Sequence, residues 1–141
     1  MEATRTATID PLAMPQGLTP DERRWWTARA NLAASVKREA DRLHREAIRD
    51  QFLAQHARDD YGRLQSEYRL RHWRKPMWVA DILFKGTAVA QNCVVDDGWY
   101  SRQASEKFAG ANAAYARTVM LMEELERFMR DRRVPKQREA S

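Results

Sequence analysis

The sequence predicts an all-α fold, an elongated antiparallel helical hairpin or coiled-coil-like bundle of two to three long helices with flexible termini. Small and apolar residues recur every seven positions in two long segments. Prolines mark where those segments end, and glycine and proline are otherwise scarce, at five of each in 141 residues. A sustained seven-residue apolar repeat is typical of helices that pack along a narrow seam.

Residues 1–18 show no periodicity and contain two prolines, so we expect a flexible N-terminal tail. The first helix should begin at Thr19, because Thr19 as N-cap and Glu22 three residues later form a capping box. Pro20 is also favourable at the first position of a helix. A repeat follows at Ala33, Ala40, Ala47, Ala54, Tyr61 and Tyr68. Pro76 disfavours helical geometry before it, which predicts a helix over about 19–75.

Residues 77–95 are apolar on most sides, and near the expected exposed side only Asp81, Lys85 and Asn92 interrupt the apolar surface. A helix of this kind should be buried on most sides. We expect no membrane span, because Asp or Lys near the centre of a span costs roughly 2.5–3.5 kcal/mol. Asp81 and Lys85 are four residues apart and could pair. One hairpin partner cannot cover such a helix, which favours self-association or a protein partner.

Asp96, Asp97 and Gly98 indicate a turn, although continuity between helices over 77–95 and 99–132 stays open. The third helix should carry two seam lines, at Phe108, Tyr115, Met122 and Met129 and at Ala104, Ala111, Thr118 and Leu125. Pro135 should end it, leaving a basic C-terminal tail over 134–141 and a single helical domain over 19–133. An antiparallel arrangement places Trp25 and Trp26 near Phe128 and Met129.

No motif for catalysis is present. Cys93 lies in an apolar run without a nearby histidine, and the serines lack a nucleophile-elbow motif. Asp41 and His44 have the spacing of a bundle metal motif, but the third helix contains no histidine to complete it. We therefore predict that the protein is not an enzyme and has no catalytic residue, metal site or cofactor.

Positive charge gathers at two places in the sequence. The net charge is +5 overall, with 25 Lys and Arg against 20 Asp and Glu. Residues 19–75 carry a net +5 and residues 127–141 a net +4, whereas residues 76–126 carry a net −3. Such clusters can contact nucleic-acid phosphates. The candidate contacts are Arg69, Arg71, Trp73, Arg74, Lys75, Arg130, Arg132, Arg133, Lys136 and Arg138.

The leading hypothesis is a non-catalytic helical module for protein–protein interaction or assembly, oligomeric or part of a larger complex. Its expected contact residues are Trp25, Trp26, Trp78, Ile82, Val89, Phe108, Tyr115, Met120, Leu121 and Met122. The alternative is a basic nucleic-acid-binding accessory protein of bacterial or phage origin, which contacts the phosphate backbone through its Arg-rich ends. A single cysteine and no apparent signal peptide favour the cytoplasm.

Overall fold

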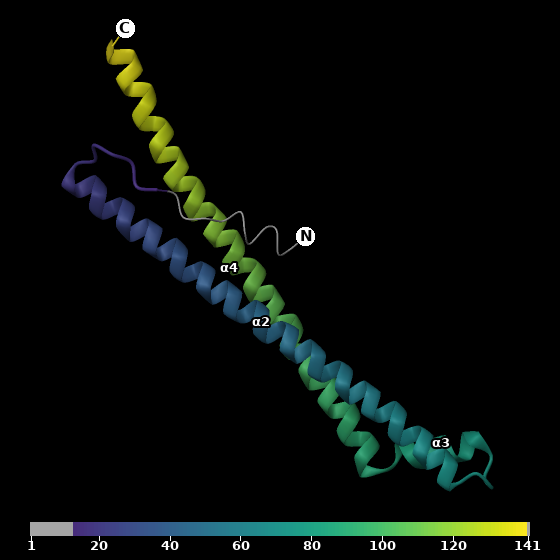
Figure 1. Ribbon diagram of the computed structural model, residues 1–141. Coiled ribbons are helices and arrows are strands. Elements are labelled where there is room, and N and C mark those ends of the chain that lie inside the picture. The colour runs from purple at the N-terminus through teal and green to yellow at the C-terminus, as the bar shows by residue number, and fades with distance from the viewer. Residues whose placement is uncertain (1–12, 141) are drawn as a thin grey trace. The chain divides into compact units, whose positions relative to one another are not determined.

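The structure, a computed structural model, describes residues 13–140, with side chains for residues 13–132. Three helices are present in this part of the chain, α2 (Pro20–Arg71), α3 (Met77–Lys85) and α4 (Ala88–Ala140), as Figure 1 shows. The described residues contain no β-strand. The predicted all-α helical hairpin is confirmed.

The chain forms two compact units. We call Met1–Arg42 with Gly110–Ser141 the terminal unit, and Leu43–Ala109 the central unit. Helices α2 and α4 contribute to both units, and α3 belongs to the central unit. Within each unit the two long helices run antiparallel, because residues early in one helix contact residues late in the other.

Small residues fill the seam in both units. The terminal unit buries Ala33, Ala40, Ala111, Thr118 and Leu125, and the central unit buries Ala47, Asp50, Ala54, Ala57 and Ala104. These positions belong to the seven-residue repeats, so the predicted seams are confirmed. Alanine at a helix–helix contact allows the two backbones to approach closely, which narrows the seam.

Helix α2 begins as the sequence predicts. The backbone N–H of Thr19 donates to Glu22 Oε1 at 3.0 Å, and the N–H of Glu22 donates to Thr19 Oγ1 at 3.2 Å. These reciprocal bonds satisfy two amides that have no partner inside the helix. Helix α2 ends at Arg71, four residues before the predicted limit.

The core of the terminal unit is aromatic. Trp26 and Leu125 are almost completely buried beside Leu18, and Phe128 and Met129 pack against them. The Phe128 ring lies 6.0 Å from that of Trp26, so the predicted packing of the tryptophan pair is confirmed. Leu18 corrects the prediction of a flexible tail over 1–18, because its side chain is anchored in this core. The other tail residues up to position 12 lie outside the described part.

The predicted boundary between the second and third helices is wrong. The helix is interrupted at Gly86 and Thr87, between α3 and α4. Helix α4 then continues without interruption through Asp96, Asp97 and Gly98. The Thr87 hydroxyl accepts the N–H of Ala90 at 3.3 Å, which makes Thr87 the N-cap of α4. A glycine followed by a good N-cap residue was the signal for this break.

Two features keep α4 helical across its acidic stretch. Asp97 accepts a hydrogen bond from Ser101 Oγ at 3.1 Å and forms an ion pair with Arg58 of α2 at 3.4 Å. Gly98 costs only about 1 kcal/mol relative to alanine in a helix. Helix α4 also extends to Ala140, so the prediction that Pro135 ends it is wrong.

Candidate interaction surface

Exposed apolar side chains are concentrated in one part of the described chain. Of the 16 large apolar residues that are exposed there, ten lie between Leu70 and Trp99. The prediction that residues 77–95 are buried on most sides is therefore wrong within the chain itself. In α3 only Ala80 and Phe84 are buried. This exposed surface is the candidate functional site.

Helix α3 is held firmly against α2 at two points. The Phe84 ring lies 5.2 Å from that of Tyr61 and 5.7 Å from that of Tyr68, so it fills the space between two turns of α2. The Arg69 guanidinium donates to both carboxylate oxygens of Asp81, at 2.7 and 2.9 Å. Two parallel bonds of this kind fix orientation as well as distance.

The Arg69–Asp81 pair changes the pKa of both partners. The hydrogen bonds from Arg69 lower the pKa of Asp81, and the same bonds raise the pKa of Arg69. The hydrogen-bonded partner of Asp81 is Arg69 of α2 and not the predicted Lys85, whose charge only adds a smaller lowering of the Asp81 pKa. The sequence spacing favoured the nearer lysine, but only the fold brings Arg69 within reach.

These anchors leave the remaining apolar side chains of α3 exposed. We call the resulting surface the α3 patch, which consists of Leu70, Trp73, Met77, Trp78, Ile82 and Leu83. These six side chains are 43–75% exposed. Exposed apolar residues gathered in one region of a protein surface often mark an interaction site.

Four cationic side chains close to the α3 patch in the sequence, Arg71, Arg74, Lys75 and Lys85, are exposed. The Arg74 guanidinium lies 5.2 Å from the centre of the Trp73 ring, a cation–π contact. The predicted concentration of positive charge at this end of α2 is therefore placed beside exposed aromatic rings.

A second apolar surface lies at the beginning of α4. We call it the α4 patch, which consists of Val89, Val94, Val95 and Trp99, all exposed. Val95 and Trp99 are four residues apart in one helix, so they share a face. The Trp99 ring also contacts Tyr100 edge-on, with ring centres 5.0 Å apart. Val94 also lines a small pocket with Ala57 and Tyr61 of α2.

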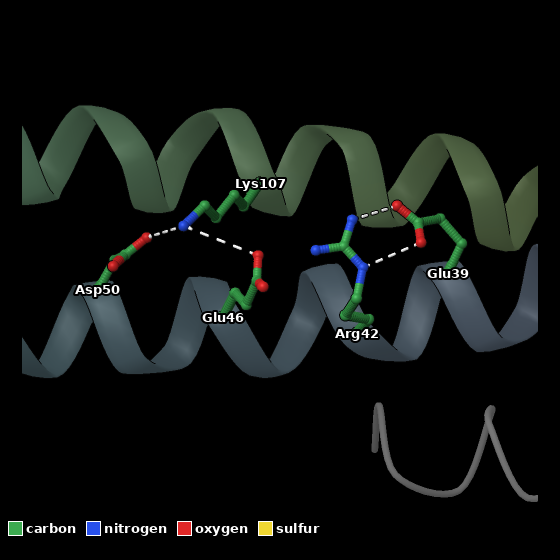
Figure 2. Close-up of polar contacts among 5 residues, drawn as sticks. All are labelled: Glu39, Arg42, Glu46, Asp50 and Lys107. Atoms are coloured by element: carbon green, nitrogen blue, oxygen red, sulfur yellow. Dashed lines mark hydrogen bonds and ion pairs between the residues drawn. The ribbon is translucent and has the colours of Figure 1, made fainter.

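Polar side chains along α2 and α4 form hydrogen bonds and ion pairs with one another. Figure 2 shows Lys107 of α4 between two carboxylates of α2, with Nζ 2.6 Å from Asp50 Oδ2 and 3.8 Å from Glu46 Oε2. The same view shows Arg42 bound to Glu39 along α2, and these bonds lower the pKa of Glu39. In the terminal unit, Tyr115 donates to Asp41.

The predicted interface residues divide by exposure. Trp25, Trp78, Ile82, Val89 and Met120 are exposed on the surface of the chain. Trp26 and Leu121 are buried inside the terminal unit, and half-buried positions are taken by Phe108, Tyr115 and Met122. Leu121 corrects the expectation that it faces outward with Met120, because only 5% of it is exposed. The sequence missed Leu70, Leu83, Val94, Val95 and Trp99 as surface apolar residues.

Three of the predicted nucleic-acid contacts have charged partners within the chain, and one of them is Arg71, which lies 4.0 Å from Glu67. Arg69 is bound to Asp81, and Arg132 donates to the Gly17 carbonyl at 3.0 Å and lies 3.6 Å from Glu22. Exposed positions are taken by Arg71, Arg74, Lys75 and Arg130, whereas Trp73 belongs to the α3 patch. The side chains of Arg133, Lys136 and Arg138 lie outside the described part.

A small pocket of the central unit contains the single cysteine. Its lining residues are Ala57, Arg58, Tyr61, Cys93, Val94 and Asp97. Burial raises the pKa of Cys93, and the nearby carboxylates of Asp60 and Asp96 raise it further. A thiol with a raised pKa is a poor nucleophile at neutral pH. Among residues 13–132, no group of three or more side chains is arranged to hold a metal ion.

Helices in the described part of the chain offer no stretch with the length and hydropathy of a membrane span. No protein-family model, curated protein or solved structure gives a significant match to this chain. The geometry of the two patches therefore carries the argument about function.

Proposed function

We propose that the protein is a non-catalytic helical module for protein–protein interaction, and that it docks another protein chain on the α4 patch. A second copy of the chain is the first partner to test. The observation that supports this is the exposure of all four apolar side chains of the α4 patch, between 50% and 66%. A cytoplasmic location fits the single cysteine, which has no partner for an internal disulfide.

Leaving these apolar side chains in water costs free energy. Valine is only a moderate helix former, so Val94 and Val95 do not stabilise an exposed helix by propensity. Burial of apolar surface gains about 25 cal/mol for each Å² removed from water. Val95 and Trp99 lie one turn apart, which is the spacing that an incoming helix needs for a side-by-side contact.

Charge around the α4 patch is mixed in sign. The neighbouring Asp96 carboxylate is exposed, Asp97 is paired with Arg58, and the exposed Arg102 lies three residues after Trp99. A partner of a single charge sign, such as a nucleic acid, gains little from such a surface. A protein helix with an apolar stripe and charged residues of both signs fits it better.

The experiment replaces the two apolar residues of the α4 patch that share one face, Val95 and Trp99, with polar residues that preserve the helix. Val95→Gln with Trp99→Gln removes the exposed apolar surface and keeps residues that form helices well. Ile48→Gln with Phe52→Gln is the matched control, because this pair has the same spacing on α2 and is also exposed. Circular dichroism verifies that each variant is folded.

We expect sedimentation velocity to show concentration-dependent association of the wild-type protein. The α4-patch variant should sediment as a monomer, and the control should behave as the wild type. If the wild type is a monomer at every concentration and captures no protein after nuclease treatment of a lysate, the proposal fails. It also fails if the control pair weakens association as strongly as the α4-patch pair.

A further inference from the structure

The α3 patch combines exposed apolar side chains with a surplus of positive charge. Trp73 and Trp78 are 72% and 68% exposed, and Ile82 is 60% exposed in the next turn after Trp78. Trp78 and Ile82 are four residues apart, so they lie on one face of α3. This face points away from Ala80 and Phe84, the two residues by which α3 is buried.

The acidic groups near the patch are already engaged. Asp81 is bound by Arg69, and Glu67 forms an ion pair with Arg63 at 3.1 Å and a longer one with Arg71 at 4.0 Å. Arg74 and Lys75, in contrast, form no ion pair among the described residues. The charge available to a partner is therefore positive, and it lies at the edge of an apolar surface.

We propose that the α3 patch binds the surface of a lipid bilayer that contains anionic lipids. Trp73, Trp78 and Ile82 enter the interfacial region, and the nearby cations pair with the lipid phosphates. A helix that lies in the interface needs an apolar face with basic residues beside it, whatever its length. Tryptophan favours this depth because its ring is apolar and its N–H is polar.

Anchoring makes α3 suited to this role. Phe84 and the Arg69–Asp81 pair hold the helix on α2, so the exposed face is formed before binding and little ordering is required at the membrane. The cation–π contact holds the Arg74 guanidinium beside the Trp73 ring, where a headgroup phosphate can be reached as the ring enters the interface.

The aliphatic members of the patch separate this proposal from nucleic-acid binding. Unpaired bases stack on aromatic rings, but Leu70, Met77, Ile82 and Leu83 offer no stacking surface. A nucleic acid would leave these side chains in water or place them against charged phosphates. A bilayer provides anionic headgroups and an apolar layer directly beneath them, which matches both parts of the patch.

Lipid binding at the α3 patch is separate from protein docking on the α4 patch, and neither depends on the other. The test uses the full chain with vesicles of phosphatidylcholine alone and vesicles of phosphatidylcholine with phosphatidylglycerol. Co-sedimentation measures binding, and quenching by brominated lipid measures whether tryptophan enters the interface. Parallel samples contain single-stranded RNA in place of vesicles.

Three pairs of substitutions give the readout. Arg74→Gln with Lys75→Gln should weaken binding about 25-fold, since each cation near an anionic surface contributes roughly fivefold. Trp78→Gln with Ile82→Gln should weaken it on the order of tenfold or more, because apolar burial is lost. Ile48→Gln with Phe52→Gln is the control, an exposed apolar pair outside the α3 patch that has the exposed Arg45 and Arg49 beside it, and should bind as the wild type.

The expected result is binding to the anionic vesicles, quenching of tryptophan by brominated lipid, and weakening with salt. The proposal is overturned if the wild type does not bind anionic vesicles, or if it binds pure phosphatidylcholine equally well. It is also overturned if both α3-patch variants bind as the wild type, or if RNA alone is bound. Val95→Gln with Trp99→Gln should keep vesicle binding, and its loss would show that binding only follows self-association.

Discussion

Replacing Lys107 with methionine tests whether the polar cluster in the seam of the central unit stabilises the fold. The change removes the ammonium group that lies 2.6 Å from Asp50 Oδ2 and leaves an isosteric apolar chain. The Asp50 side chain is only 9% exposed, so water cannot fully replace the lost partner. An uncompensated buried charge is among the few causes of severe destabilisation.

The size of the effect follows from burial. Removing one member of a fully buried pair costs about 3–5 kcal/mol. The Lys107 side chain retains 28% exposure, which allows some water to enter. We therefore expect Lys107→Met to lower the free energy of unfolding by about 2–3 kcal/mol. At about 3–4 °C for each kcal/mol in a chain of this size, Tm should fall by roughly 6–12 °C.

Urea unfolding followed by circular dichroism measures this difference. Lys37→Met is the matched control, because Lys37 has a similar exposure of 32% but pairs with the more exposed Asp41 at 3.8 Å within one helix. It should cost less than about 0.5 kcal/mol. Combining Lys107→Met with Asp50→Ala should recover most of the loss, since no buried charge remains unpaired.

Three results would refute this reasoning. The first is a Lys107→Met variant as stable as the wild type. The second is a double variant as unstable as Lys107→Met alone, which would locate the loss in packing. The third is a Lys37→Met control that loses as much stability as Lys107→Met.

Three further predictions concern the helices around the site. Phe84→Ala should cost about 3–5 kcal/mol, detach α3 from Tyr61 and Tyr68, and make residues 72–88 the first point of cleavage in limited proteolysis. Asp81→Asn should destabilise the protein at neutral pH. Because Arg69 lowers the pKa of Asp81 in the folded protein, that difference from the wild type should begin to shrink as pH falls below the ordinary value of 3.8 and vanish only below the lowered pKa, as an acid titration can show. Gly98→Ala should raise stability by about 1 kcal/mol in thermal unfolding, since Gly98 is helical and has open space around its Cα.

The long helices and their seams could be predicted from the sequence, because the seven-residue repeat is a local pattern with a direct structural meaning. The start of α2 could equally be predicted from the sequence, since Thr19, Pro20 and Glu22 specify it within one turn. The pairing of Trp26 with Phe128 followed from an antiparallel arrangement about the residues near Pro76. These features depend on spacing and on chain direction alone.

The site was less predictable, because it depends on what the fold leaves uncovered. The apolar character of residues 77–95 indicates burial, but α3 packs on α2 through Phe84, and within α3 Ala80 and Phe84 are the buried residues. The partner of Asp81 was misassigned because Arg69 is twelve residues away in sequence and becomes a neighbour only when α3 folds back. The Asp-Asp-Gly stretch predicts a turn from local sequence, but tertiary contact with Arg58 supports the helix there.

The alanine seam has a consequence for how the hairpin finds its alignment. A row of identical small residues at intervals of seven is nearly periodic, so sliding one helix past the other by one repeat would again oppose small residues. Packing alone distinguishes poorly between such alignments. In the terminal unit the distinction is made by Trp26, which has its aromatic neighbour at one position only. In the central unit it is made by Asp50, whose carboxylate meets an ammonium group in a single alignment. The alanine seam alone therefore permits several registers of the two helices, and Trp26 and Asp50 each select one register in their unit.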